Sequence, residues 1–173
     1  MRKKLRELLE TIIVSSPEAW AKIWGSSQYP SVHGQVSFYP AWGGSLIVAE
    51  LMGLPNPSQV CRQPIFGFHV HAGSQCTGNT NDPFADANGH FNPDDCLHPE
   101  HAGDLPPIFG ADGYGLSIFF TNRFDPEELI GRTLILHGMP DDFTTQPSGN
   151  SGIKIACGAI RGAGVSDFQH MNF

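Results

Sequence analysis

The chain has 173 residues, enough for one domain with a sizeable core, and its 20 glycines, 14 prolines and 16 % charged residues indicate a loop-rich β fold. Its formal net charge of −7 argues against nucleic acid as a partner, and no segment approaches the length of a transmembrane helix, so we expect no stable membrane insertion. From residue 7 onward only six basic residues stand against seventeen acidic ones.

The N-terminal segment has the pattern of an amphipathic helix. Its apolar residues share one helical stripe: Leu5, Leu8, Leu9, Ile12 and Ile13. Arg6, Glu7 and Glu10 interrupt the run, and no small-residue cleavage site is clear, so a signal peptide is not indicated and a cytoplasmic location is expected. We predict an N-terminal helical extension over residues 1–18 that docks on the domain or on a second subunit, in preference to a membrane surface.

Most of the remaining chain reads as short strands. Ser16-Pro17-Glu18 could begin a helix, but residues 19–24 alternate weakly and favour a strand. A helical turn is indicated near Asp125-Pro126. The pattern predicts an all-β fold, an eight-stranded Greek-key sandwich or barrel with long loops. The strand-like runs after residue 24 are 32–39, 46–51, 65–71, 108–109, 115–121, 133–137 and 153–160.

Residues 67–105 concentrate five of the eight histidines and two of the four cysteines. His69 and His71 are two apart in an apolar run, so on a strand both imidazoles point to one face. A lone histidine on a strand is more often structural than a ligand, but six histidines and an aspartate from two strands and one loop predict a metal site for more than one ion. After the strand with His69 and His71, the other candidate ligands are His90, His98, His101 and Asp104 in the loop, and His137 at the end of a second strand-like run.

Five motifs in this order resemble the copper–zinc superoxide dismutases over about residues 30–161: GFHVH, GHFNP, HAGDL, GRTLILH and IACGAI. The resemblance also places the family's first strand at residues 19–24. It implies a dismutase-like domain over residues 19–161 and a C-terminal tail over 162–173.

The resemblance implies two metal ions that share one ligand. Copper would be held by His69, His71, His90 and His137. Zinc would be held by His90, His98, His101 and Asp104, with His90 as the bridging imidazolate. Asp141 matches the family's outer aspartate, which links His69 to His98 and would fix the orientation of both rings.

The cysteines are interpreted through the same resemblance. Cys76 and Cys157 match the positions of the family's intrasubunit disulfide, although four cysteines in a cytoplasmic protein would otherwise suggest thiols or metal ligands. Cys61 and Cys96 have no assigned partners, so they either pair with each other or remain thiols.

The implied function is enzymatic: superoxide dismutation to O2 and H2O2 by copper redox cycling, with zinc structural and His90 taking part in proton transfer. Lys154 stands where the family has an arginine that guides the anion, and lysine keeps the charge but lacks the planar fork. The loop after His137 carries only Asp141 and Asp142 as charges, so weaker guidance is expected. The alternative is a metal-binding relative that holds zinc or buffers copper with little turnover. The resemblance also allows a homodimer.

Overall fold

A computed structural model describes residues 6–7, 10, 12, 14–56 and 64–164 of the chain. Its elements are ten strands and two short 3-10 helices. The strands are β1 (Ala19–Gly25), β2 (His33–Pro40), β3 (Ser45–Met52), β4 (Ile65–Phe66), β5 (Phe68–His71), β6 (Ile108–Phe109), β7 (Tyr114–Thr121), β8 (Thr133–His137), β9 (Lys154–Ala159) and β10 (Arg161–Gly162), and the 3-10 helices are η1 (Ala85–Ala87) and η2 (Pro126–Leu129).

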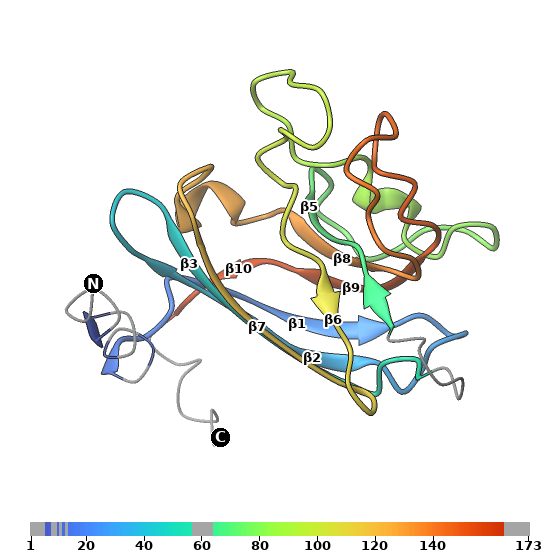
Figure 1. Ribbon diagram of the computed structural model, residues 1–173, viewed down its shortest axis with the longest axis horizontal. Helices are drawn as coiled ribbons and strands as arrows, with labels where there is room; N and C mark the ends of the chain where they lie inside the picture. The colour runs from blue at the N-terminus through green and yellow to red at the C-terminus, as the bar shows by residue number, and fades with distance from the viewer. Residues whose placement is uncertain (1–5, 8–9, 11, 13, 57–63, 165–173) are drawn as a thin grey trace.

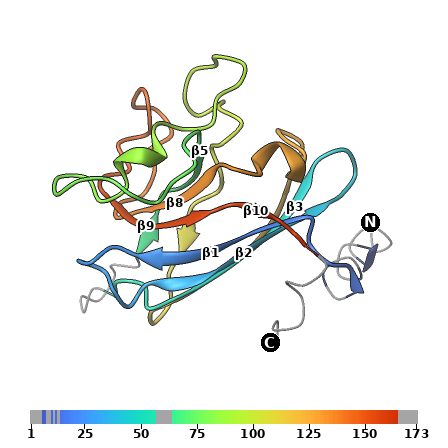
Figure 2. The same ribbon diagram turned by 180° about the vertical axis from the view of Figure 1, so that it is seen from behind.

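One curved sheet of eight strands forms a half-barrel, in the order β5-β8-β9-β1-β2-β3-β7 with β10 also beside β1 (Figure 1). All of its paired neighbours are antiparallel. The pair β4–β6 forms a separate small ribbon. In the view from behind, β1, β9 and β10 lie on the side of the sheet that faces the viewer (Figure 2). The predicted all-β fold is therefore confirmed, as a half-barrel.

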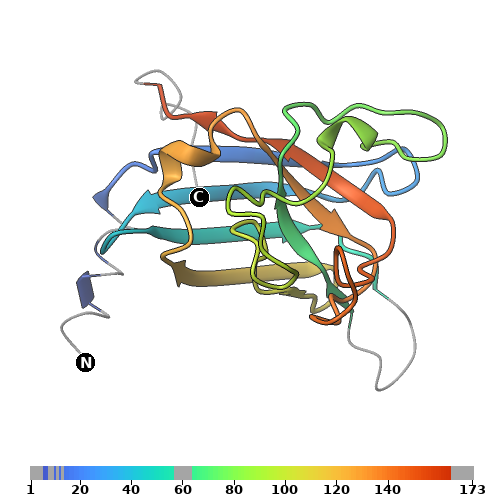
Figure 3. The ribbon, with the colours of Figure 1, turned by 90° about the horizontal axis from the view of Figure 1, so that it is seen from above.

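The long loops gather over the β5, β8 and β9 side of the sheet, as the view from above shows (Figure 3). They are the connection from β5 to β6, residues 72–107, and the connection from β8 to β9, residues 138–153. Both belong to the stretches with little periodicity in the sequence. This arrangement puts the outer face of three strands under a cover of loop residues.

Strands β5 and β8 are buried on both faces. Period-two alternation sends Phe68 and Val70 into the main core of the half-barrel, which leaves His69 and His71 on the opposite face, under the loops. On β8, Leu134 and Leu136 join the same core, whereas Ile135 packs on the loop side with Phe84, Ala87 and Cys157. The loops thus form a second, smaller buried layer.

Several predicted elements are confirmed with small shifts, and one is divided. Residues 19–25 form a strand, so the local helix signal at Ser16-Pro17 does not prevail. The run 65–71 breaks at Gly67, whose N–H donates to the carbonyl of Met139 (2.8 Å) and whose carbonyl accepts from the N–H of His137 (2.8 Å). These two bonds tie the chain to the end of β8 and separate β4 from β5.

The expected N-terminal amphipathic helix finds no support, because Leu5, Leu8, Leu9 and Ile13 lie outside the described residues. The same holds for most of the tail, residues 165–173, although Arg161–Gly162 adds a short strand beside β1 that the sequence did not indicate. The three-part division of the chain stays a prediction. In the part of the chain that the structure describes, no helix has the length and apolar character needed to cross a membrane.

Candidate metal centre

Two paired strands carry three of the site's histidines. His69 and His71 lie on β5, which pairs with β8 through Val70 and Leu134. His137 ends β8 at a register shift between Leu136 and His137, which brings it opposite Lys154 instead of the next residue of β9. Such an irregularity redirects a side chain at the end of a strand. Here it accompanies the placement of His137 beside the two histidines of β5.

The loop residues of the site are held against the free edge of β5. Isolated bridges join His69 to Asp104 and His71 to His90. The N–H of Val70 donates to the carbonyl of Gly103 (2.9 Å), and the N–H of Phe91 donates to the carbonyl of Val70 (2.8 Å). A Cβ at Gly103 would collide with the Val70 carbonyl, so this close approach requires glycine.

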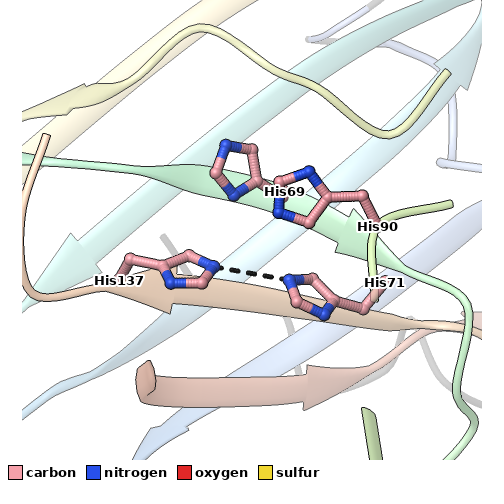
Figure 4. A group of neighbouring side chains, drawn as sticks. All are labelled: His69, His71, His90 and His137. Carbon is pink, nitrogen blue, oxygen red and sulfur yellow. Dashed lines mark hydrogen bonds between the residues drawn. The ribbon is translucent and has the colours of Figure 1, made fainter. Parts of the chain in front are cut away.

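Two groups of side chains result, and each brings its ligand atoms within 4.8 Å of one another. The first is His69, His71, His90 and His137, shown in Figure 4. The second is His90, His98, His101 and Asp104. His90 belongs to both groups. The structure thus brings together every residue predicted to hold a metal, while their roles as ligands remain a prediction.

Hydrogen bonds outside the first group decide which nitrogens face inward. The Nδ1 atoms of His71 and His137 lie 2.7 Å from the Asn88 carbonyl and 3.2 Å from the Gly152 carbonyl. Each ring therefore donates from Nδ1 and turns Nε2 inward, where the two Nε2 atoms lie 3.4 Å apart (Figure 4). His69 is reversed, because its Nε2 contacts the carboxylate of Asp141 (2.7 Å) and leaves Nδ1 facing the group.

Asp141 contacts one histidine of each group. One carboxylate oxygen lies 2.7 Å from His69 Nε2 and the other 2.9 Å from His98 Nε2. Burial opposes the charge, but hydrogen bonds from His69, the N–H of Phe143 and His98 lower the pKa of Asp141 to about 2. Gly149 packs so tightly on this link that a Cβ there would collide with Asp141.

Asp104 is the counterpart of Asp141 in the second group. One of its oxygens lies 2.7 Å from His90 Nδ1, and the other accepts from the N–H of His101 (3.0 Å). The same oxygen lies 3.1 Å from His98 Nδ1 and 3.2 Å from His101 Nδ1. Burial raises its pKa, but the bond from His90 and the nearby imidazoles lower it overall, so this carboxylate is ionised among three histidines.

Unpaired nitrogens test whether the site fits metal ions. Among the described residues, five buried side-chain N or O atoms lack a hydrogen-bond partner, and four of them belong to the two groups. Leaving a buried polar atom unpaired costs about 1–3 kcal/mol, so such a concentration in one place needs a partner of another kind. The four atoms are His69 Nδ1, His90 Nε2, His98 Nδ1 and His101 Nδ1. The last two lie 3.1 and 3.2 Å from Asp104 but do not form a hydrogen bond with it. The donor set therefore fits one metal ion in each group.

The protonation state of the strand histidines also fits metal binding. Burial lowers the pKa of His69 and lowers that of His71 further, and it brings the pKa of His137 to about 3. Neighbouring imidazoles add to the effect by mutual repulsion of the charged forms. All three rings are neutral near pH 7, which is the form that donates a lone pair to a metal.

The disulfide implied by the resemblance is confirmed between Cys76 and Cys157. It joins the loop after β5 to β9, next to Ile135 and Phe84 in the smaller buried layer. Cys96 is a free thiol, and Cys61 lies outside the described residues.

A cavity of about 520 Å³ opens onto the first group, and Lys154 lines it together with His71, His90 and His137. Its ammonium does not point freely into that space. Lys154 Nζ donates to Asp82 Oδ2 (2.8 Å) and to the Phe84 carbonyl (3.0 Å). The predicted guiding lysine thus lies at the cavity, with a carboxylate as its partner.

Three residues that hold the site were not identified from the sequence. Asp82 pairs with Lys154 across 72 positions of the chain. Arg123 Nη1 donates to the carbonyls of Pro99, His101 and Asp104 at 3.0 to 3.1 Å. Gln146 forms two hydrogen bonds with the backbone of His98: its Oε1 accepts from the His98 N–H (3.0 Å) and its Nε2 donates to the His98 carbonyl (2.7 Å). No local pattern marks any of them, because their partners are distant in sequence.

Comparison with known proteins gives a consistent result. The family described as "Copper/zinc superoxide dismutase (SODC)" matches residues 32–160. "Superoxide dismutase [Cu-Zn] 2" of Aquifex aeolicus is 34 % identical over 145 residues, 75 % of this chain and 80 % of that protein. "Superoxide dismutase [Cu-Zn]" of Deinococcus radiodurans is 34 % identical over 153 residues, 78 % of this chain and 80 % of that protein. The solved "Cu/Zn superoxide dismutase from Brucella abortus" is 27 % identical with a TM-score of 0.68, over 82 % of this chain and 99 % of that one.

Proposed function

The chain belongs to the copper/zinc superoxide dismutase family and is an oxidoreductase of that kind, and we propose that its two ligand groups are the copper site and the zinc site. The reaction is the dismutation of two superoxide anions and two protons to O2 and H2O2. The observation that carries the assignment of the sites is the set of four buried imidazole nitrogens without a hydrogen-bond partner, all of which lie in the two groups.

Copper would be held by the group that opens onto the cavity, formed by His69, His71, His90 and His137. When bound there, copper supplies a change of one electron in oxidation state, which the dismutation requires. Zinc would be held by His90, His98, His101 and Asp104, where the aspartate supplies the negative charge that suits a zinc site. Zinc has a single oxidation state, so its contribution is to charge and structure.

The chain itself holds the rings in place and provides a route for protons. The carbonyls of Asn88 and Gly152 and the carboxylate of Asp141 fix three rings from outside, so that the inward nitrogens are ready without rearrangement. His90 Nε2 has no hydrogen-bond partner among the described residues, and His90 lines the cavity. This atom is where the chain can hold a proton and release it to the product.

The experiment that tests the function is a dismutation assay on the purified protein, with copper and zinc quantified in the same sample before and after reconstitution. We expect activity that rises in proportion to bound copper. Full copper occupancy without dismutation would overturn the catalytic proposal.

The assignment of the copper side is tested by His137→Ala. This variant should lose copper binding and dismutation while it keeps zinc at unchanged stoichiometry, because His137 belongs to the first group alone. Metal content by mass spectrometry and the far-ultraviolet spectrum check the result. Unchanged dismutation in this variant would remove His137 from the site.

A second candidate function is metal holding, with zinc bound or copper buffered and little turnover. The observation that favours it is the pairing of Lys154 with Asp82, since Lys154, the one lysine or arginine among the described residues that line the cavity, lacks a free charge to attract superoxide. A protein isolated with zinc and with persistently empty copper sites would support this function over the enzyme.

Homodimer formation and a cytoplasmic location are also kept as proposals. The support for a second copy is the outer face of β7, where four alternate residues are large, apolar and exposed: Tyr114, Leu116, Ile118 and Phe120. An exposed apolar row of this kind is typical of an interface. Sedimentation measures the assembly. The Cys76–Cys157 disulfide bears on the compartment, because such bonds persist best in oxidising surroundings, so cell fractionation is the relevant measurement.

A further inference from the structure

The cavity above the first histidine group contains one cation and one anion. Lys154 and Asp82 are the only lysine, arginine, aspartate or glutamate residues among those that line it in the described part of the chain. The other polar residues of the lining carry no fixed charge: three asparagines, Asn81, Asn88 and Asn92, together with Ser148 and four histidines. Because Lys154 Nζ and Asp82 Oδ2 are 2.8 Å apart, the side chains at the mouth contribute almost no net charge.

Lys154 is held in this position by a single turn of the loop after β5. The carbonyl of Phe84 and the carboxylate of Asp82 accept two of its three protons. The turn is itself ordered, since Asp82 Oδ1 accepts from the N–H of Phe84 (3.0 Å) and Asn79 Oδ1 accepts from the N–H of Asp82 (3.1 Å). With only 15 % of its side chain exposed, Lys154 has little freedom to move its charge toward an incoming anion.

The two charges act differently on anions of different valence. A lone ammonium would attract a dianion twice as strongly as a monoanion, and abundant dianions would then compete with a small monoanionic substrate. A carboxylate beside the ammonium cancels this attraction. The attractive energy that the carboxylate removes is twice as large for a dianion as for a monoanion. Superoxide carries a single negative charge, so it loses the smaller amount.

We propose that Asp82 is a positioning and specificity-determining residue, which holds Lys154 at the cavity mouth and cancels its charge so that dianions gain no extra attraction over superoxide. The inference rests on the proposed function, because superoxide is the anion for which the mouth selects. It concerns the binding of anions, however, and can be tested without turnover.

The test compares Asp82→Asn with the parent protein, using inorganic phosphate as the probe anion. The amide oxygen of asparagine can still accept from the N–H of Phe84, so the turn is kept while one negative charge is lost. A unit charge about 5 Å from the bound anion in a water-like dielectric corresponds to roughly a fourfold change for a monoanion and roughly a tenfold or greater change for a dianion. Phosphate at a pH where the dianion dominates should therefore bind about tenfold more tightly, measured by 31P NMR titration of the metal-loaded protein.

Asp112→Asn is the matched control, because it removes the same charge from the turn between β6 and β7, outside the residues that line the cavity. Phosphate affinity in this variant should stay within about twofold of the parent, which accounts for the change in net charge. The double variant Asp82→Asn/Lys154→Gln restores a neutral mouth, so its affinity should return close to that of the parent.

The rate of superoxide dismutation is the second measurement. In Asp82→Asn the rate constant at low ionic strength should rise by roughly fourfold or less, and this gain should disappear at high salt while inhibition by phosphate becomes stronger. Phosphate affinity in Asp82→Asn equal to that of Asp112→Asn would overturn the role of Asp82. A parent protein that binds copper but does not dismutate superoxide would overturn the proposed function instead, and the phosphate titration would still decide the inference about Asp82.

Discussion

The strand-borne and the loop-borne parts of the metal centre are held in place by different forces. His69, His71 and His137 lie on β5 and β8, whose backbone ladder and apolar core fix them before any ligand is considered. The loop part, which carries His98 and His101, contains little regular structure. Side-chain contacts hold it instead, from Asp104, Asp141, Arg123 and Gln146.

The difference predicts which half of the site depends on metal. The backbone hydrogen bonds between strands persist when no metal is bound to the histidines. A loop that is ordered by carboxylates and imidazoles around a metal ion loses its main organising contact when that ion leaves. The loop over residues 90–104 should therefore be the part that loosens without zinc. Three changes sharpen or break this comparison, in decreasing order of expected effect.

Acidifying the metal-free protein tests the cost of burying neutral histidines on the strands. The pKa values of His69, His71 and His137 are lowered on folding, so below the ordinary value of about 6.5 the unfolded chain binds more protons. Stability is thus complete above about pH 6.5 and falls with falling pH, by up to about 1.4 kcal/mol per pH unit for each ring, toward the pKa of about 3 for His137. Denaturant unfolding at a series of pH values measures the slope.

The control for this experiment is His137→Asn, which removes one titrating ring. Its slope between pH 6.5 and 4.5 should be smaller by about 1.4 kcal/mol per pH unit. The lowered pKa of Asp141, about 2, also favours stability at higher pH, but its effect is confined to pH values below about 4. Stability that stayed constant from pH 7 to 4.5 would show that the strand histidines are not buried as neutral rings.

Asp141→Asn acts on the contact that joins the two parts. An amide cannot accept from both His69 and His98 as the carboxylate does, so each ring loses some of its orientation. Removing such an outer carboxylate typically costs 10- to 100-fold in metal affinity, about 1.4–2.7 kcal/mol. Competition with a chelator should show the larger loss for zinc, because His98 lies on a loop whereas His69 lies on a strand. Equal losses for the two metals would contradict the comparison.

Arg123→Lys should have the smallest effect, limited to the loop. One guanidinium nitrogen of Arg123 bonds three carbonyls of the loop over residues 99–104, and a flexible ammonium holds such a fixed arrangement less well. We expect the loss of about 1–2 kcal/mol of local stability. Hydrogen exchange of residues 100–104 should become about tenfold faster, while the amides of β5 and β8 keep their protection.

The matched control is Arg161→Lys, the same substitution at an exposed arginine of β10. Its exchange pattern over residues 100–104 should equal that of the parent protein. If Arg123→Lys also leaves the loop unchanged, the loop is ordered by its histidines and aspartates without help from the arginine.

Local pattern was enough to predict much of the fold and the shared face of two histidines. Alternation placed His69 and His71 on one face, because side chains on a strand repeat every two residues. The strand at Thr133–His137 appears with the predicted bounds. The resemblance carried by the short motifs identified the residues that the structure brings into two groups, and the Cys76–Cys157 pair.

Tertiary structure alone decided how the site is held and how it is charged. Gly67 divides the predicted strand because it bonds to Met139, and Lys154 loses its free charge because Asp82 lies 2.8 Å away. Arg123 and Gln146 reach backbone carbonyls of a loop distant in the sequence. Periodicity reports which face of an element a residue occupies, but a contact between distant residues exists only once the elements are packed. For this reason the members of the two groups could be predicted from the sequence, whereas the charge at the mouth of their cavity could not.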